Sequence, residues 1–192
     1  APVDSPLAAL PPALQPGRVE IINDPAVLES RIGRDVRLLS VTPRGGAGSS
    51  ELSPTNKSVD VGAELRLVGT VASPIVDGNI VQANDVDILG NLAVVAYNFA
   101  GDVFAGALQV IDFSAPRHPV VVSEVLYRSA EVTAVALEGS HVYAGIAADD
   151  ATLPTPAVLQ ELRLTGSGGL EATGAWVQLP SWAVTDMAVQ GR

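Results

Sequence analysis

The sequence contains no cysteine, and aromatic side chains make up only 4% of its 192 residues. Without cysteine, disulfides, thiolate metal ligands and thiol catalysis are all excluded. No run of about 18 apolar residues occurs, which excludes a transmembrane helix. Hydrophobic residues, mostly valine and alanine, still make up 47% of the chain. This composition is typical of a globular protein with a core of small or β-branched side chains, and it favours sheet over helix.

Basic residues are also scarce. Lysine and arginine total 11 against 21 aspartates and glutamates, for a net charge of −10, and Lys57 is the single lysine. Proteins that bind nucleic acid use lysine and arginine to neutralise phosphates, so the charge argues against nucleic acid as a partner. We interpret the excess of acid as a solubility feature and not as a site for a substrate.

Residues 1–17 are rich in proline, which removes backbone donors and favours extended, polyproline-like conformations. We expect this segment to be a Pro-rich N-terminal arm. A small first residue followed by such a run is typical of a mature chain after removal of a signal peptide. The sequence therefore favours an exported protein, secreted or at the cell surface of a bacterium.

Residues 18–83 form a separate N-terminal segment. We expect strands at 19–22 and 36–41 around a short turn or helix. The alternative is a helix that begins here, with Asp24 as N-cap and Pro25 at the first helical position.

The rest of this segment contains turn-forming residues. Residues 43–58 consist largely of Gly, Ser, Pro, Asn and Thr with no apolar period, which predicts a mobile linker. An outer strand is expected near residues 64–71.

Residues 84–192 contain an internal repeat. The segment 85–97 recurs as 134–146, with Gly90 aligned to Gly139, a spacing of 49 residues. The segment 108–113 recurs as 159–164, in the same order along the chain. A third copy begins at Asp186. Because the order of the matched pieces is kept, we interpret them as structural repeats with loops of variable length.

Each unit holds about four short strands separated by Gly, Ser and Pro turns over about 40 to 50 residues, the size of a β-propeller blade. The predicted fold class is all-β, with blades of about four antiparallel strands; a β-sandwich with similar hairpins is the alternative. Propellers need about four to eight blades, so two repeats and the start of a third cannot close a ring. We therefore expect an incomplete propeller, truncated at a hairpin, whose remaining blades lie on a second chain or a C-terminal continuation.

The first unit also resembles a known family. The residues at 85–91, 93–97 and 106–123 are similar to the LVIVD repeat of bacterial surface and exported proteins, and the match is good from 107 to 122. Phe113 and Ala115 depart from the family's pattern, and the second unit has lost its Asp-Pro turn. The resemblance implies a propeller fold and no particular activity, because the repeat is a scaffold shared by proteins of differing roles.

Asp85 and Asp87 are the candidate metal ligands. They alternate on one strand and point to the same side, so together they offer oxygen ligands of the kind that Ca²⁺ prefers. The spacing of an EF-hand is missing, and a turn-flanking or solvent-facing role is the alternative.

Binding candidates lie in the loops and near the end of the chain. Asn98 and Asp102 belong to one blade loop, residues 98–106, and Asp149 and Asp150 to another, residues 147–156. Loops on a rigid scaffold are where binding usually resides.

Trp176 and Trp182 flank residues 179–181 and are candidates for a small aromatic face near the blade edge. Core packing is favoured for them, and a platform on which a sugar stacks is the alternative. His118 and His141 are expected to be surface residues beside turns.

Two classes of function are open. The favoured one is a non-enzymatic scaffold whose blade loops bind a protein or a glycan. The alternative is part of a hydrolase-like propeller enzyme whose catalytic residues lie mostly in blades outside this chain. The first is favoured because no nucleophile elbow, zinc-protease motif or phosphate-binding loop occurs in the sequence.

Overall fold

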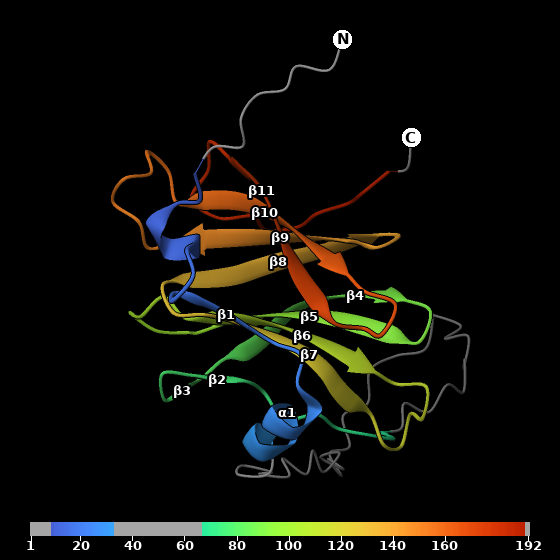
Figure 1. Cartoon of the computed structure of the whole chain (residues 1–192). Helices are drawn as coiled ribbons and strands as arrows, with labels where there is room; N and C mark the ends of the chain where they lie inside the picture. Colours follow the sequence, from blue (N-terminus) through green and yellow to red (C-terminus); the bar gives the residue numbers. More distant parts are fainter. Residues whose placement is uncertain (1–8, 33–66, 191–192) are drawn as a thin grey trace, which may run out of the picture.

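The computed structural model describes residues 9–32 and 67–190 of the chain (Figure 1). Over these residues the protein consists of antiparallel strands, with a short α-helix and a single 3-10 turn near the N-terminus. The predicted all-β fold class is confirmed. The predictions for residues 1–8, for the strand at 36–41 and for the linker at 43–58 lie outside the described residues.

Two four-stranded antiparallel meanders with the same strand order form most of the structure. The first sheet contains β4 (Gln82–Leu89), β5 (Leu92–Asn98), β6 (Gly106–Asp112) and β7 (Val120–Tyr127). The second contains β8 (Ala130–Glu138), β9 (His141–Ala148), β10 (Ala157–Leu164) and β11 (Leu170–Gln178). The turns after β4 and β8 correspond, because Gly90 and Gly139 adopt φ of 61° and 58°, a left-handed conformation that glycine reaches without strain.

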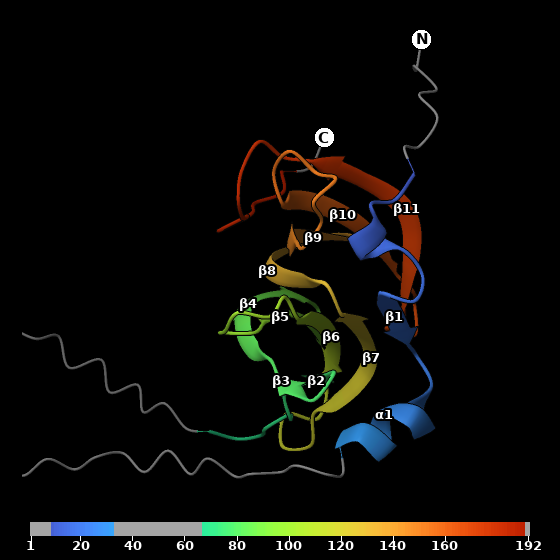
Figure 2. The same cartoon turned by 90° about the vertical axis from the view of Figure 1, so that its left-hand side faces the viewer.

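The two sheets stack face to face, as Figure 2 shows. The core between them is made of valine, alanine and leucine, and includes the fully buried Val94, Leu108, Ile146 and Val158. Each such side chain contributes about 1.5–3 kcal/mol when removed from water. A core of many small side chains is consistent with the low aromatic content of the sequence.

The N-terminal segment extends and covers the first sheet. After the 3-10 turn η1 (Pro12–Leu14), β1 (Val19–Ile22) pairs with β7 as a fifth strand, and α1 (Pro25–Ile32) follows. Both interpretations of this segment hold in part. The strand at 19–22 is confirmed, and a helix does begin at Pro25, where Oδ1 of Asp24 accepts a hydrogen bond from the Ala26 N–H at 2.9 Å.

No strand forms at residues 67–74, so the outer strand expected near 64–71 is absent from the described part of that range. Gly69 instead packs against the β6–β7 turn, where a Cβ on Gly69 would fall 2.3 Å from the carbonyl oxygen of Pro116 and 2.9 Å from Cδ of Pro119. Only a residue without a side chain fits this close approach of the segment to the turn.

A two-stranded hairpin of β2 (Ile75–Val76) and β3 (Asn79–Ile80) follows, on the side of the first sheet that faces away from the second (Figure 2). Its turn has positive φ at Asp77 and Gly78, as an Asp-Gly hairpin turn requires.

The third repeat, expected from Asp186, has no strand within residues 183–190. Val184 is nevertheless buried against the face of the second sheet that points away from the first, together with Ala134, Ala157 and Met187. The contact is close, since a Cβ on Gly145 would lie 2.6 Å from Cβ of Val184. Among the described residues, the structure has no helix with the length and apolarity needed to span a bilayer.

Candidate functional site

Asp85 and Asp87 lie where β4 and β8, an edge strand of each sheet, meet. Oδ1 of each carboxylate accepts the N–H of the next residue in β4, at 2.8 Å in both cases. Oδ2 of Asp85 accepts the Val135 N–H, and Oδ2 of Asp87 accepts the Leu137 N–H, again at 2.8 Å. The two carboxylates therefore bridge the facing edges of β4 and β8, and we call them the carboxylate clip.

The clip fixes how the strands run. Moving two residues along β4 moves the partner two residues along β8, so the two strands point in the same direction. Asn84 extends the pattern, since its Nδ2 donates to the carbonyl oxygen of Thr133 at 2.6 Å. Strand edges with free N–H groups invite pairing with other chains, and here side chains occupy those groups.

The predicted calcium site coincides with this clip. All four oxygens of Asp85 and Asp87 accept a backbone N–H, so a cation would compete with four donors. In the described ranges, no three His, Cys, Asp or Glu side chains gather into a set that could hold a metal ion. The two aspartates therefore have a structural role, since their carboxylates link the two sheets through hydrogen bonds.

The predicted binding loops lie at one end of the sheets. Residues 99–105 join β5 to β6, and residues 149–156 join β9 to β10, at the equivalent place in the second unit. Asp102 and Asp149 are exposed, and Asn98 is partly buried as the last residue of β5.

Asp150 stabilises the second loop. Its Oδ1 accepts hydrogen bonds from the backbone N–H and the hydroxyl of Thr152, at 2.9 and 2.6 Å, and its Oδ2 accepts the Ala13 N–H at 3.4 Å. Desolvation raises the pKa of Asp150, but the hydrogen bonds from Thr152 and Ala13 outweigh it and hold that pKa below its usual value.

The two tryptophans have different surroundings. Trp176 lies on β11 and packs against the core between the sheets, whereas Trp182 follows the sheet and is 78% exposed. The favoured core packing therefore holds for Trp176. Both histidines are exposed, as expected; Nδ1 of His141 lies 3.0 Å from Oε1 of Glu161.

A buried polar cluster was not foreseen from the sequence. The Tyr97 hydroxyl donates to Oε1 of Gln109 at 2.8 Å, and Nε2 of Gln109 donates to Oε2 of Glu124 at 2.9 Å. Arg31 of α1 places its Nε 3.2 Å from Oε1 of Glu124, an ionic contact whose angles fall outside those of a hydrogen bond. Burial and the nearby Glu124 charge raise the pKa of Tyr97.

The polar cluster attaches α1 to the first sheet. Gln109 and Glu124 occupy buried positions on the face of the first sheet that points away from the second, and their pairing is set by the register of β6 and β7. Strand alternation indicates which residues share a face, but not which residues of neighbouring strands meet.

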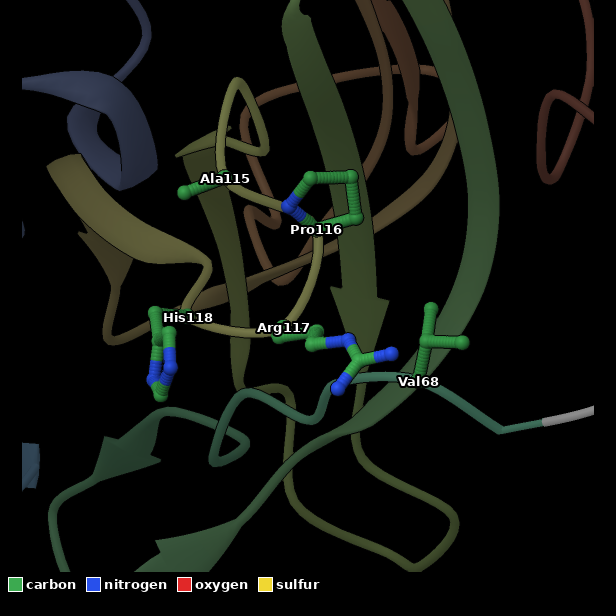
Figure 3. A pocket seen from close by; sticks show the side chains of 5 residues that line it. All are labelled: Val68, Ala115, Pro116, Arg117 and His118. Carbon is green, nitrogen blue, oxygen red and sulfur yellow. The ribbon is translucent and has the colours of Figure 1, made fainter.

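A shallow hollow lies at the other end of the sheets, between residues 67–70 and the β6–β7 turn. Figure 3 shows Arg117 extending toward Val68 beside the Pro116 ring, with the His118 ring on the other side of the turn. This hollow is lined by apolar side chains, by Arg117 and by His118.

Comparison with family models, with curated proteins and with solved structures gives no match for this chain. The resemblance to the LVIVD repeat stays a prediction from the sequence.

Proposed function

We propose that this chain contributes two blades to a β-propeller that serves as a non-enzymatic binding scaffold. The observation that carries the proposal is the carboxylate clip. It aligns the innermost strands β4 and β8 side by side in the same direction, as the inner strands of neighbouring blades run around a propeller axis. In a sandwich of two independent meanders, nothing requires this alignment.

The segment after β11 supports the same arrangement. In the repeat alignment Asp186 corresponds to Asp85, and its Oδ1 accepts the Met187 N–H at 2.8 Å, as Oδ1 of Asp85 accepts the N–H of its own neighbour. Val184 covers the second sheet on the face that corresponds to the one β8 covers on the first. These contacts support the proposal that residues 183–188 run where a third inner strand would lie, although they form no strand themselves.

The first sheet also has an uncovered strip. Val86 and Ile88 alternate with the clip residues on β4 and point away from the second sheet, and Val86 is 53% exposed. Large exposed apolar side chains in a row are typical of an interface. A neighbouring blade, on another part of the polypeptide or on a second chain, would bury them.

Binding is assigned to the loops at 99–105 and 149–156, on a surface that the two sheets hold rigid. The ionisable side chains nearest the core support structure: the clip links the sheets, Asp150 ties its loop to η1, and the polar cluster holds α1. The Pro-rich N-terminal arm and the acidic net charge are consistent with a protein or glycan ligand outside a bacterial cell.

Chemical labelling tests the propeller arrangement, because the chain has no cysteine of its own. Val86→Cys probes the strip, and Val27→Cys on α1 is the control, since these valines are 53% and 42% exposed and Val27 lies outside the proposed binding loops. In the assembled protein purified from its natural source, we expect maleimide to modify position 86 at least about 10-fold more slowly than position 27. Equal rates at the two positions would refute the covered inner strip and, with it, the propeller.

A further inference from the structure

The hollow beside the β6–β7 turn gathers exposed apolar side chains. Leu67, Val68 and Val120 line it and are 71%, 52% and 57% exposed. Gly69 packs directly on Pro116, so the extended segment 67–70 forms one wall and the turn forms the other. Covering apolar side chains of this size with a ligand removes them from water, which contributes favourably to the free energy of binding.

The same hollow carries an arginine and a histidine whose side chains have no partner in the described ranges. The other arginines in the described ranges donate to oxygen acceptors: Arg18, Arg31, Arg128 and Arg163. Arg117 makes no hydrogen bond or ion pair with its side chain anywhere in that part of the chain, and neither does the His118 ring next to it. His141, by contrast, is paired with Glu161.

An arginine without an acceptor is conspicuous in a protein with 21 acidic residues and a net charge of −10. A guanidinium has five N–H donors and forms its strongest contacts with a planar carboxylate, through two parallel hydrogen bonds. Figure 3 shows the Arg117 guanidinium extended toward Val68, so a group that meets these donors also touches an apolar wall.

We propose that this hollow binds an acidic peptide segment of a partner protein, with a carboxylate on Arg117 and a neighbouring apolar side chain between Val68 and Pro116. A carboxylate is favoured over a phosphate because the acidic chain repels a ligand of nearly two charges about twice as strongly as one of a single charge. The hollow and the loops at 99–105 lie at opposite ends of β6, so either site can fail without affecting the other.

The probe is the peptide acetyl-Leu-Glu-Leu-amide, titrated into the ¹⁵N-labelled full chain at low salt and followed by NMR. We expect saturable shifts at the Gly69 amide and the Arg117 Nε–H with a dissociation constant in the millimolar range, as befits a few contacts. Arg117→Gln should weaken binding at least about 10-fold, since it removes a charge-assisted pair. His118→Gln should weaken it less, because its ring lies on the far side of the turn.

Three controls decide the chemistry. Arg163→Gln, which removes the same charge from an exposed arginine on the second sheet, should leave the affinity unchanged within about 2-fold. The neutral peptide acetyl-Leu-Gln-Leu-amide should bind at least about 10-fold more weakly; equal binding would overturn the carboxylate site. Tighter binding of inorganic phosphate than of the acidic peptide, at the same two signals, would overturn the peptide as ligand.

Discussion

Removing the carboxylate clip should lower the stability of the fold without changing the apolar core between the two sheets. In the double variant Asp85→Asn, Asp87→Asn, each amide keeps one oxygen and replaces the other with an NH₂ group. Whichever way the amide turns, one backbone N–H, on β4 or on β8, then faces a donor in place of an acceptor. Four hydrogen bonds of 2.8 Å become at most two.

The magnitude follows from these bonds. A hydrogen bond to a charged group contributes about 1.5–3 kcal/mol net, and the lower end applies here because both aspartates are partly exposed. One lost bond per residue therefore lowers the unfolding free energy by about 1.5 kcal/mol, and the double variant by about 3 kcal/mol. The two sites are close enough to couple, so the sum is accurate to about 1 kcal/mol.

Urea unfolding followed by circular dichroism measures this loss. Asp102→Asn is the control for the removal of an acid, since this exposed loop residue should change stability by less than about 0.5 kcal/mol. A double variant as stable as Asp102→Asn would refute the clip. So would a wild type that gains stability with millimolar Ca²⁺ while the double variant does not, because that pattern identifies a bound ion.

Three further predictions concern other contacts. Desolvation raises the pKa of Asp150, but the hydrogen bonds from Thr152 and Ala13 outweigh it and hold that pKa below its usual value. The stabilisation is therefore complete above the usual aspartate pKa of about 3.9 and is lost as the pH falls through the lower folded-state value. Between about pH 5 and pH 2.5, thermal unfolding should show a smaller loss of stability in Asp150→Ala than in the wild type; an equal loss would contradict this. Arg31→Ala leaves the buried carboxylate of the polar cluster without its cation and should lower the unfolding free energy by about 2 kcal/mol, measured by urea unfolding. In Gly145→Ala the new methyl group would displace Val184, so hydrogen exchange should accelerate in the segment after β11, whereas Gly166→Ala, with open space around it, should not change it.

The sequence predicts the strands of the two sheets better than it predicts the contacts between distant segments. The strands at the Gly90 and Gly139 turns follow from alternating apolar residues between turn residues, which is local information. The clip does not follow from it. Asp85 and Asp87 are predicted to share a side of their strand, but their partners are backbone groups about 50 residues away, and only the stacking of the sheets brings them together.

The N-terminal segment shows the same limit. Asp24-Pro25 is a local helix signal, and the helix begins there. The pairing of β1 with β7 joins residues more than 100 positions apart and leaves no mark in either strand. Loop acids are ambiguous for a related reason: Asp102 and Asp150 look alike in the sequence, yet only Asp150 meets an N–H from η1.

Little room is left for a neighbouring blade on the face of the first sheet that points away from the second. α1 lies over β7, and the chain around β3 buries Val81 against Tyr97 and Ala107, so most of this face is already covered (Figure 2). The open strip with Val86 and Ile88 is about one strand wide, far narrower than the contact between the two sheets. Because apolar stabilisation scales with the area buried, the contact that covers this strip should be the weakest one in the proposed propeller. In the assembled Val86→Cys protein, maleimide should therefore gain access at a lower urea concentration than the one that unfolds the sheets, and coincident midpoints would show a contact as strong as the core.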